Sequence, residues 1–242
     1  MDLFKTWLVE TSIAHRGLHN DLLPENSIGA FENAIKNGYP IELDVHIISD
    51  GTIIVFHDDT LSRVTSKDGY VMNLTKDSLC EYKLLNTKYT IPTLDEVLAI
   101  VNGQVPLLIE IKNTGKVGEL ESKLLKTLKE YTGEYAIQSF NPLVLEWFKV
   151  NAPEIPRGQL ASYFKDEKIS FFKKFALKRM IFNKKLSCPH FISYDARNLP
   201  NRHVRKYKKL PLLAWTVRNQ EQYLKVVKYC DNVIFENFEP KI

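Results

Sequence analysis

The chain has 242 residues and a formal net charge of +4 at pH 7. Hydrophobic residues make up 44% of it and charged residues 26%, which are values of folded globular proteins, so a mainly disordered chain is excluded. The small, mixed positive charge permits an anionic substrate but gives no ground for a nucleic-acid partner.

The cysteines and the N-terminus bear on the cellular compartment. Cys80, Cys188 and Cys230 form no close pair, which argues against a disulfide framework and a thiolate zinc site. Charged residues interrupt the apolar runs at the N-terminus, and no stretch approaches the ~18 apolar residues of a membrane span. We expect a cytoplasmic protein without a signal peptide and without stable membrane insertion. The oligomeric state cannot be inferred from the sequence.

Short runs typical of strands alternate with helical patterns along the chain. Helix-start residues at 24–27 and helical spacing of apolar residues predict the first helix, which Gly38 ends. The predicted strands begin near residues 13, 41, 107, 135, 157, 191, 212 and 233, and the predicted helices cover 28–37, 93–103, 117–131, 142–150, 200–209 and 219–230. Eight such units in about 240 residues predict an α/β fold, a (β/α)₈ TIM barrel, as a single domain over residues 1–242.

One segment breaks the alternation. After the strand at 41–45, Asp50-Gly51 stands between two apolar runs, a pattern typical of a hairpin turn. We interpret it as the second strand running past the barrel rim and returning, which would bring His57 to the level of Asp44. Residues 58–91 then form a small insertion on the active-site face. Counting 52–58 as a barrel strand would give nine strands, so the topology favours the hairpin.

Three carboxylates and a lysine share one face of two predicted strands. Side chains alternate across a strand, so the apolar residues face the outer helices and the polar ones point into the barrel at its C-terminal end, where TIM-barrel active sites lie. Unpaired buried carboxylates are costly, and oxygen ligands without cysteine suggest a hard divalent cation, Mg²⁺ or Ca²⁺. The alternative is a salt network with the lysine, which leaves three negative charges under-neutralised. The residues are Glu42, Asp44, Glu110 and Lys112.

Two histidines end predicted strands beside polar neighbours. Histidine is the natural acid and base near neutral pH, and His15 and His57 could share the two roles across one bond. Arg16 offers a bidentate donor for a phosphate, and Lys112 offers a second positive charge. The other histidines are interpreted as structural, with His46 the least certain because it shares the strand face of the carboxylates; they are His19, His46, His190 and His203.

Taken together, these motifs resemble the glycerophosphodiester phosphodiesterase family, in the same order from about residue 12 to the C-terminus. HRG alone is weak, but the combination is a strong signature. The motifs are HRG at 15–17, PENS at 24–27, ELDV at 42–45, DGTIIVFHDDTLSRVT at 50–65, IPTLDEVL at 91–98, LLIEIK at 107–112, QSF at 138–140 and AWTV at 214–217. Two positions depart from the family pattern. Ser27 stands where threonine is more usual, and we expect it to cap the helix all the same. The final strand ends in VIFENFEP rather than in the expected Asp/Tyr-Pro ending.

The resemblance implies a (β/α)₈ barrel with a small insertion after the second strand. It also implies metal-dependent hydrolysis of glycerophosphodiesters, a small-molecule substrate, to sn-glycerol 3-phosphate and an alcohol. The implied roles are metal ligands for Glu42, Asp44 and Glu110, an acid/base pair for His15 and His57, phosphate binding for Arg16 and Lys112, and an aromatic wall near the glycerol for Phe140 and Trp215.

Two other functions are compatible with parts of this sequence. A related barrel enzyme, a lysophospholipase D or a sphingomyelinase D-like phosphodiesterase, would act on membrane lipids and could close a cyclic phosphate. A non-catalytic binding barrel should have lost at least one of the metal or acid/base residues, and all five are present.

Residues 165–185 form a basic stretch with interleaved Phe171, Phe172 and Phe175. On a helical wheel its basic and apolar residues do not separate into two faces. We therefore predict a partly buried helix with a solvated basic side. The alternative is an interfacial patch or an anionic-substrate patch beside a barrel strand.

Overall fold

The computed structural model describes residues 2–113, 115–164, 170–181, 183 and 185–241. By their contacts the residues group into two compact units. The N-terminal unit comprises residues 14–135, and the C-terminal unit comprises residues 136–242 together with 1–13. All the strand runs expected from the sequence are present, with an additional short strand in the hairpin.

The sheet of the N-terminal unit is built around one long buried strand. This strand pairs in parallel with β4, which sets Asp44 beside Glu110, and its start pairs with Ala14 of β1. It also pairs antiparallel with β3, with Val45 opposite Val55. The bounds are β1 (Ile13–Ala14), β2 (Ile41–Ile47), β3 (Ile53–Val55) and β4 (Leu107–Ile111).

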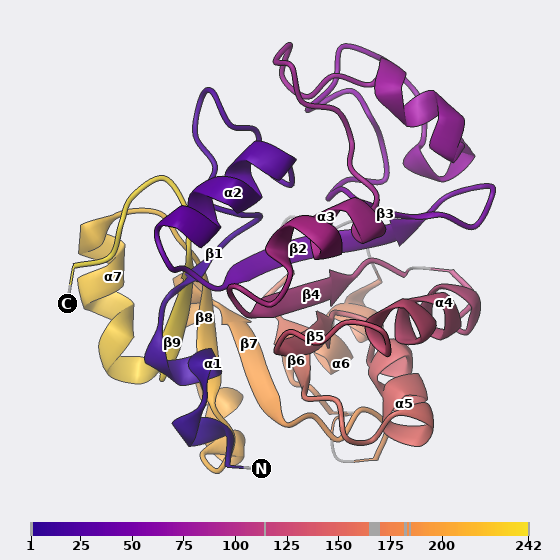
Figure 1. The fold of residues 1–242 in the computed structure, drawn as a ribbon. Coiled ribbons are helices and arrows are strands. Elements are labelled where there is room, and N and C mark those ends of the chain that lie inside the picture. Colours follow the sequence, from indigo (N-terminus) through magenta and orange to yellow (C-terminus); the bar gives the residue numbers. More distant parts are fainter. Residues whose placement is uncertain (1, 114, 165–169, 182, 184, 242) are drawn as a thin grey trace. The chain divides into compact units, whose positions relative to one another are not determined.

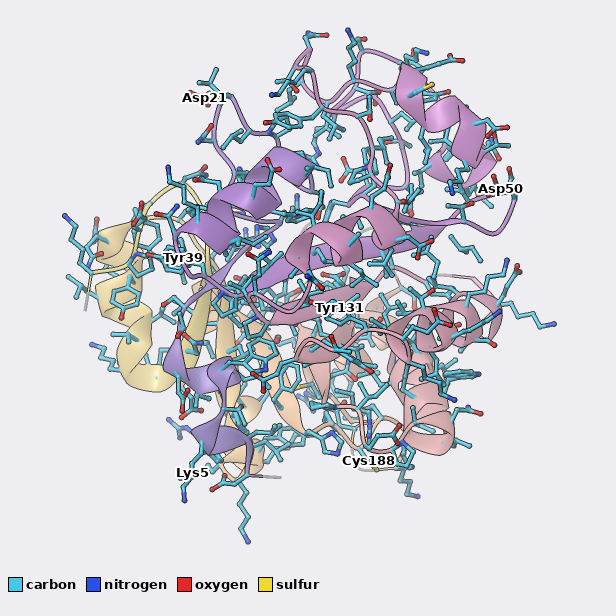
Figure 2. The ribbon with its side chains drawn as sticks, viewed as in Figure 1. Lys5, Asp21, Tyr39, Asp50, Tyr131 and Cys188 are labelled. Carbon is cyan, nitrogen blue, oxygen red and sulfur yellow. The ribbon has the colours of Figure 1, made fainter. Side chains whose placement is uncertain are left out.

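The predicted hairpin is confirmed. The turn places Gly51 at φ +83°, a left-handed conformation that suits glycine, and the neighbouring Asp50 stands at the tip (Figure 2). On the returning strand the Phe56 amide donates to the Asp44 carbonyl at 2.9 Å. His57, the next residue, therefore returns to within one residue of the level of Asp44, as expected.

The helices of this unit begin at the capping residues that the sequence offers. The Ser27 hydroxyl accepts from the Ala30 amide at 3.2 Å, so serine caps this helix as expected. Thr93 and Glu96 form a capping box at the next helix. The bounds are α2 (Ile28–Lys36), α3 (Leu94–Val101) and α4 (Glu119–Leu128), and α2 packs against α3 (Figure 1).

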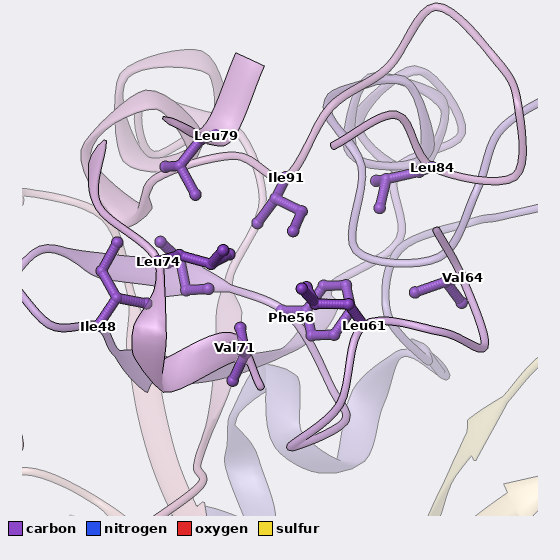
Figure 3. Packing of buried hydrophobic residues seen from close by; sticks show 10 residues of the cluster. Ile48, Phe56, Leu61, Val64, Val71, Leu74, Leu79, Leu84 and Ile91 are labelled. Atoms are coloured by element: carbon purple, nitrogen blue, oxygen red, sulfur yellow. The ribbon is translucent and has the colours of Figure 1, made fainter. Parts of the chain in front are cut away.

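Residues 58–91 hold two 3₁₀ helices, η2 (Val71–Asn73) and η3 (Lys76–Glu81), and only isolated bridges. They close over their own apolar cluster, which also takes in residues of the hairpin (Figure 3). Burial of this cluster stabilises the segment without a barrel strand. Its members are Ile48, Ile54, Phe56, Leu61, Val64, Val71, Leu74, Leu79, Leu84 and Ile91.

The C-terminal unit holds five parallel strands that pair in chain order. The chain's first residues join them, because the Asn232 side chain donates to the carbonyls of Leu8 at 2.9 Å and Thr11 at 2.7 Å. The strands are β5 (Tyr135–Ser139, in this unit from Ala136), β6 (Arg157–Ala161), β7 (Phe191–Asp195), β8 (Leu212–Val217) and β9 (Asn232–Phe235). The helices are η1 (Leu3–Lys5), α1 (Trp7–Glu10), α5 (Pro142–Asn151), α6 (Phe171–Lys178), η4 (Ala196–Asn198), α7 (Gln220–Val226) and η6 (Val227–Tyr229).

The predicted helix over 200–209 is wrong. The segment contains only a short 3₁₀ helix, η5 (Val204–Tyr207). The Asn201 side chain accepts from the amides of residues 203 and 204 and so bonds the backbone locally in place of a helix. Closely spaced cations repel one another on a helix, and Pro211 follows at once.

No helix in the described parts of the chain is both long and apolar enough to cross a membrane. Part of the basic stretch, namely Lys165, Asp166, Glu167, Lys168 and Lys184, lies outside the described residues.

Candidate active site

Three carboxylates converge within the N-terminal unit. Glu42 and Asp44 come from β2 and Glu110 from β4, and each offers an oxygen atom within 4.8 Å of the others. All three side chains are buried, with Glu42 and Asp44 1% exposed. The parallel register that sets Asp44 beside Glu110 produces this convergence. The strand alternation thus brings together the three residues that the sequence singled out.

Two cationic side chains lie against these carboxylates. The Lys112 Nζ atom lies 2.8 Å from Glu110 Oε1 and 3.4 Å from Asp44 Oδ1. The Arg16 Nε atom lies 3.3 Å from Asp44 Oδ2, and the Arg16 backbone amide donates to Glu42 Oε2 at 3.0 Å. The alternative interpretation, a carboxylate–lysine network, is therefore partly present.

The network does not neutralise all three carboxylates. Burial raises the pKa of Glu42 well above its usual value, and the negative charges of Asp44 and Glu110 raise it further. Burial also acts to raise the pKa of Asp44, but the positive charges of Lys112, His57 and Arg16 outweigh it and lower that pKa. The ionised form of Glu42 is consequently disfavoured.

A hard divalent cation fits this environment. All three candidate ligands are carboxylate oxygens, the donors that Mg²⁺ and Ca²⁺ prefer. A cation among them would favour the ionised form of Glu42. The group of Glu42, Asp44 and Glu110 could therefore bind a metal ion.

Asn26 belongs to this site, although the sequence reasoning assigned it only to a helix start. Its Nδ2 donates to Asp44 Oδ2 at 2.9 Å, and its Oδ1 accepts from the Asp44 amide at 3.4 Å. Its backbone has φ +55°, a left-handed conformation in which asparagine is enriched. The sequence did contain a signal for this role. Asn26 stands within the PENS motif, and asparagine can both adopt this backbone conformation and bond a carboxylate.

A chain of ion pairs links Arg16 to His57, and the sequence reasoning missed its middle members. Glu25 accepts from Arg16 Nη1 and from Arg63 Nη2, both at 2.7 Å. Arg63 also pairs with Asp58, which accepts from His57 Nδ1. Burial opposes ionisation of Glu25, yet its bonds to Arg63 and Arg16 lower its pKa to about 2. These ion pairs thus connect Arg16, the candidate phosphate-binding residue, with His57, the candidate acid/base residue.

The two candidate catalytic histidines differ in their surroundings. His15 follows β1 directly and is buried, whereas the His57 side chain is 30% exposed. The Asp58 carboxylate bonded to His57 Nδ1 leaves Nε2 as the ring atom suited to proton exchange. His46 bonds through Nε2 to the His57 carbonyl at 3.2 Å, so it supports the position of His57 through the backbone.

The two predicted aromatic residues lie in the C-terminal unit. Phe140 follows β5 and Trp215 lies in β8, and their rings meet edge to face with centroids 5.5 Å apart. Phe164, which the sequence reasoning did not select, packs against Phe140 with centroids 5.8 Å apart. An apolar wall of three rings results.

Comparison with known proteins gives one family match that spans most of the chain. Residues 15–238 match the Glycerophosphoryl diester phosphodiesterase family. The chain belongs to this family. The motif resemblance is thereby confirmed, and with it the expected enzyme class, a phosphoric diester hydrolase.

Two curated relatives illustrate the similarity. The chain is 38% identical to a glycerophosphodiester phosphodiesterase of Caldanaerobacter subterraneus over 61% of its own length, and the aligned region is 65% of that relative. It is 28% identical to a putative glycerophosphodiester phosphodiesterase of Bacillus subtilis, over 88% of each chain.

Solved structures of related proteins have the same fold. An Oleispira antarctica phosphodiesterase in complex with the product sn-glycerol-3-phosphate has a TM-score of 0.80 at 24% identity, covering 95% of this chain and 93% of that one. The glycerophosphodiester phosphodiesterase of Thermotoga maritima has a TM-score of 0.70 at 25% identity, covering 92% of each. The predicted fold, a (β/α)₈ TIM barrel, is confirmed.

Proposed function

We propose that the protein hydrolyses small glycerophosphodiesters to sn-glycerol 3-phosphate and an alcohol. The observation that carries the proposal is the convergence of Glu42, Asp44 and Glu110 beside Arg16 and Lys112 within a chain of this family. The Oleispira antarctica phosphodiesterase is in complex with the product sn-glycerol-3-phosphate, which supports the same product for this chain.

The proposed cofactor is one divalent cation, Mg²⁺ or Ca²⁺, held by Glu42, Asp44 and Glu110. When bound, the ion supplies positive charge to a phosphate oxygen and to the charge that develops there in the transition state. Arg16 and Lys112 bind the remaining phosphate oxygens. Their present partners are carboxylate oxygens, which have the same hydrogen-bonding preference as phosphate.

His15 and His57 divide the proton transfers in this proposal. One takes the proton of the nucleophile, and the other gives a proton to the departing alkoxide. Asp58, held by Arg63, orients the His57 ring so that Nε2 exchanges the proton. The nucleophile is either water or the glycerol 2-hydroxyl, and a cyclic phosphate intermediate distinguishes the second route from the first.

Phe140 and Trp215 contact the glycerol in this proposal, as the family resemblance implies. We also propose that residues 1–242 form one domain, with 58–91 as an insertion on the active-site face. The family match supports one domain because it spans residues of both compact units.

A substrate panel tests the proposed function. We expect turnover of glycerophosphocholine and glycerophosphoethanolamine with release of sn-glycerol 3-phosphate, measured by coupled dehydrogenase detection. Turnover of lysolipids alone, or accumulation of a cyclic phosphate as the final product, would favour the membrane-lipid phosphodiesterase instead. Lack of turnover of every diester, with metal present, would contradict both.

Asn26 provides a prediction about orientation of a metal ligand. Replacing Asn26 with Ala removes the donor to Asp44 Oδ2, and loss of such an orienting partner usually weakens metal affinity by about 10–100-fold. Calorimetric titration with Mg²⁺ or Ca²⁺ measures the change. Asn33→Ala is the matched control, because Asn33 donates to the backbone carbonyl of Leu18. Equal affinity in the two variants would remove Asn26 from the site.

A further inference from the structure

Helix α6 presents three phenylalanines outward rather than toward the core. The exposed fractions are 75% for Phe171, 83% for Phe172 and 41% for Phe175. Their rings form one cluster, with centroids 6.0 Å apart for Phe171–Phe172 and 6.5 Å apart for Phe171–Phe175. Among the side chains of this helix that the structure describes, only the small Ala176 is buried. We call these three residues the aromatic face. The helix is partly buried, as predicted from the sequence, but its phenylalanines are exposed.

Hydrogen bonds hold the end of α6 against the C-terminal unit. The exposure of the aromatic face therefore does not arise because the helix lies apart from the rest of the unit. The Tyr194 hydroxyl donates to the Lys178 carbonyl at 3.0 Å, and Lys206 Nζ donates to the Arg179 carbonyl at 2.6 Å. The Tyr207 hydroxyl donates to the Met180 carbonyl at 3.0 Å. These bonds fix the C-terminal end of α6 against β7 and η5 while the phenylalanines point away.

The surroundings of the aromatic face are strongly basic. Residues 170–210 contain twelve Lys or Arg and one acidic residue, Asp195, although the whole chain has a net charge of only +4. Asp195 is itself paired with Arg197 at 2.8 Å. The charge of the segment is therefore almost entirely uncompensated within its own sequence.

Several of these cations gather beside α6. The Arg179 guanidinium lies 3.9 Å from the centroid of the Phe175 ring. Burial lowers the pKa of His203, and the nearby charges of Lys178, Arg202, Arg179 and Lys206 lower it further, which places four cations around one imidazole. We call the cations of this region the basic rim: Lys174, Lys178, Arg179, Arg202, Arg205 and Lys206.

We propose that the aromatic face and the basic rim dock the protein on an anionic lipid membrane. The phenylalanines would enter the boundary between headgroups and acyl chains, and the cations would contact the anionic headgroups. The phenylalanine side chain has no polar atom that could hydrogen-bond with water. A cluster of exposed phenylalanine rings therefore indicates contact with an apolar partner. The excess of positive charge calls for a negative one. An anionic bilayer offers both an apolar interior and a negatively charged surface.

The contact would be peripheral, since no described helix can span a bilayer. Lipid is favoured over an acidic protein or a nucleic acid because the three rings lie together as one apolar cluster, rather than separately as stacking platforms among the cations. The docking surface is independent of the proposed hydrolysis, because neither the aromatic face nor the basic rim contains a residue of the candidate active site.

Vesicle flotation tests the proposal. The full chain should float with phosphatidylcholine vesicles that contain about one third phosphatidylglycerol, and not with phosphatidylcholine alone. Phe171→Ala with Phe172→Ala should weaken vesicle binding by about tenfold through lost apolar burial. Lys174→Gln, Arg202→Gln and Arg205→Gln should weaken it by about fivefold per charge, and less at high salt, where screening shortens the range. The Phe172→Trp variant should show a blue shift of fluorescence on anionic vesicles.

Matched controls come from another exposed surface of the same unit, on α7 and η6. The aromatic control is Leu224→Ala with Tyr229→Ala, and the charge control is Lys225→Gln with Lys228→Gln; Leu224 is 61% and Tyr229 44% exposed. All variants should keep wild-type turnover of a soluble diester, which shows that they fold. Lack of vesicle binding, equal losses in the controls, or sensitivity to the charges alone would overturn the proposal. Binding of single-stranded DNA or of an acidic protein in place of vesicles would overturn it as well.

Discussion

Removal of divalent metal should abolish diester hydrolysis, and Mg²⁺ or Ca²⁺ should restore it. The expectation rests on three buried carboxylates that two cationic side chains do not neutralise. The measurement is turnover of glycerophosphocholine after chelation, with the metal content determined by mass spectrometry and each ion added back separately. Full activity in protein shown to be free of metal would contradict the proposed cofactor.

Glu42 gives the metal prediction a pH dependence with a definite sign. Burial together with Asp44 and Glu110 raises its pKa, so without metal the folded state binds a proton more tightly at Glu42 than the unfolded state does. The stability from that proton is fully present below the unfolded pKa and is lost as pH rises through the raised folded pKa. A bound cation replaces the proton. Metal should therefore raise the thermal midpoint more at pH 8 than at pH 5, by differential scanning calorimetry.

Glu42→Gln separates metal binding from folding. The variant should lose metal binding and activity while its metal-free form becomes at least as stable as the wild type at pH 8, because the unfavourable charge is gone. Glu32→Gln, an exposed carboxylate on α2, is the control and should change neither property. A Glu42→Gln protein that still binds Mg²⁺ with wild-type affinity would remove Glu42 from the ligand set.

The sequence predicted what depends on local periodicity and missed what depends on contacts between distant residues. Alternation along 41–45 and 107–112 was enough to place the carboxylates on one face, and Asp50-Gly51 was enough to place the hairpin. The orienting role of Asn26 arises from a bond to a residue 18 positions away. The Glu25–Arg63 pair spans 38 positions. No periodic pattern encodes such bonds.

The errors outside the site have a similar cause. Residues 200–209 show helical spacing, but the Asn201 side chain and the adjacent cations favour a shorter turn. For α6, the helical wheel did not show that the phenylalanines would be the exposed side chains. The wheel is read on the assumption that apolar residues turn toward the core, and Phe171 and Phe172 do not.

His15→Ala and His57→Ala should each lower kcat by at least about 10²-fold, the usual scale of a positioned proton transfer. The effect should lie in kcat rather than in metal affinity, since neither histidine is one of the three carboxylate ligands. Loss of one partner of an acid/base pair should also remove one limb of the bell-shaped dependence of kcat on pH. Stopped assays across pH, with Mg²⁺ titrations on the same preparations, separate these effects.

The surroundings of His15 and His57 determine which control variants are informative. His57 is held by Asp58, so Asp58→Asn should also lower kcat, because the amide no longer favours the His57 tautomer with a proton on Nδ1. His203→Ala is the matched control, because His203 lies among the cations beside α6 and has no proposed part in proton transfer. If His15→Ala or His57→Ala retained near-wild-type kcat with normal metal affinity, that histidine would have a structural role. The other histidine would then need a different group as its partner, because an acid and a base on opposite sides of the scissile bond are two separate groups.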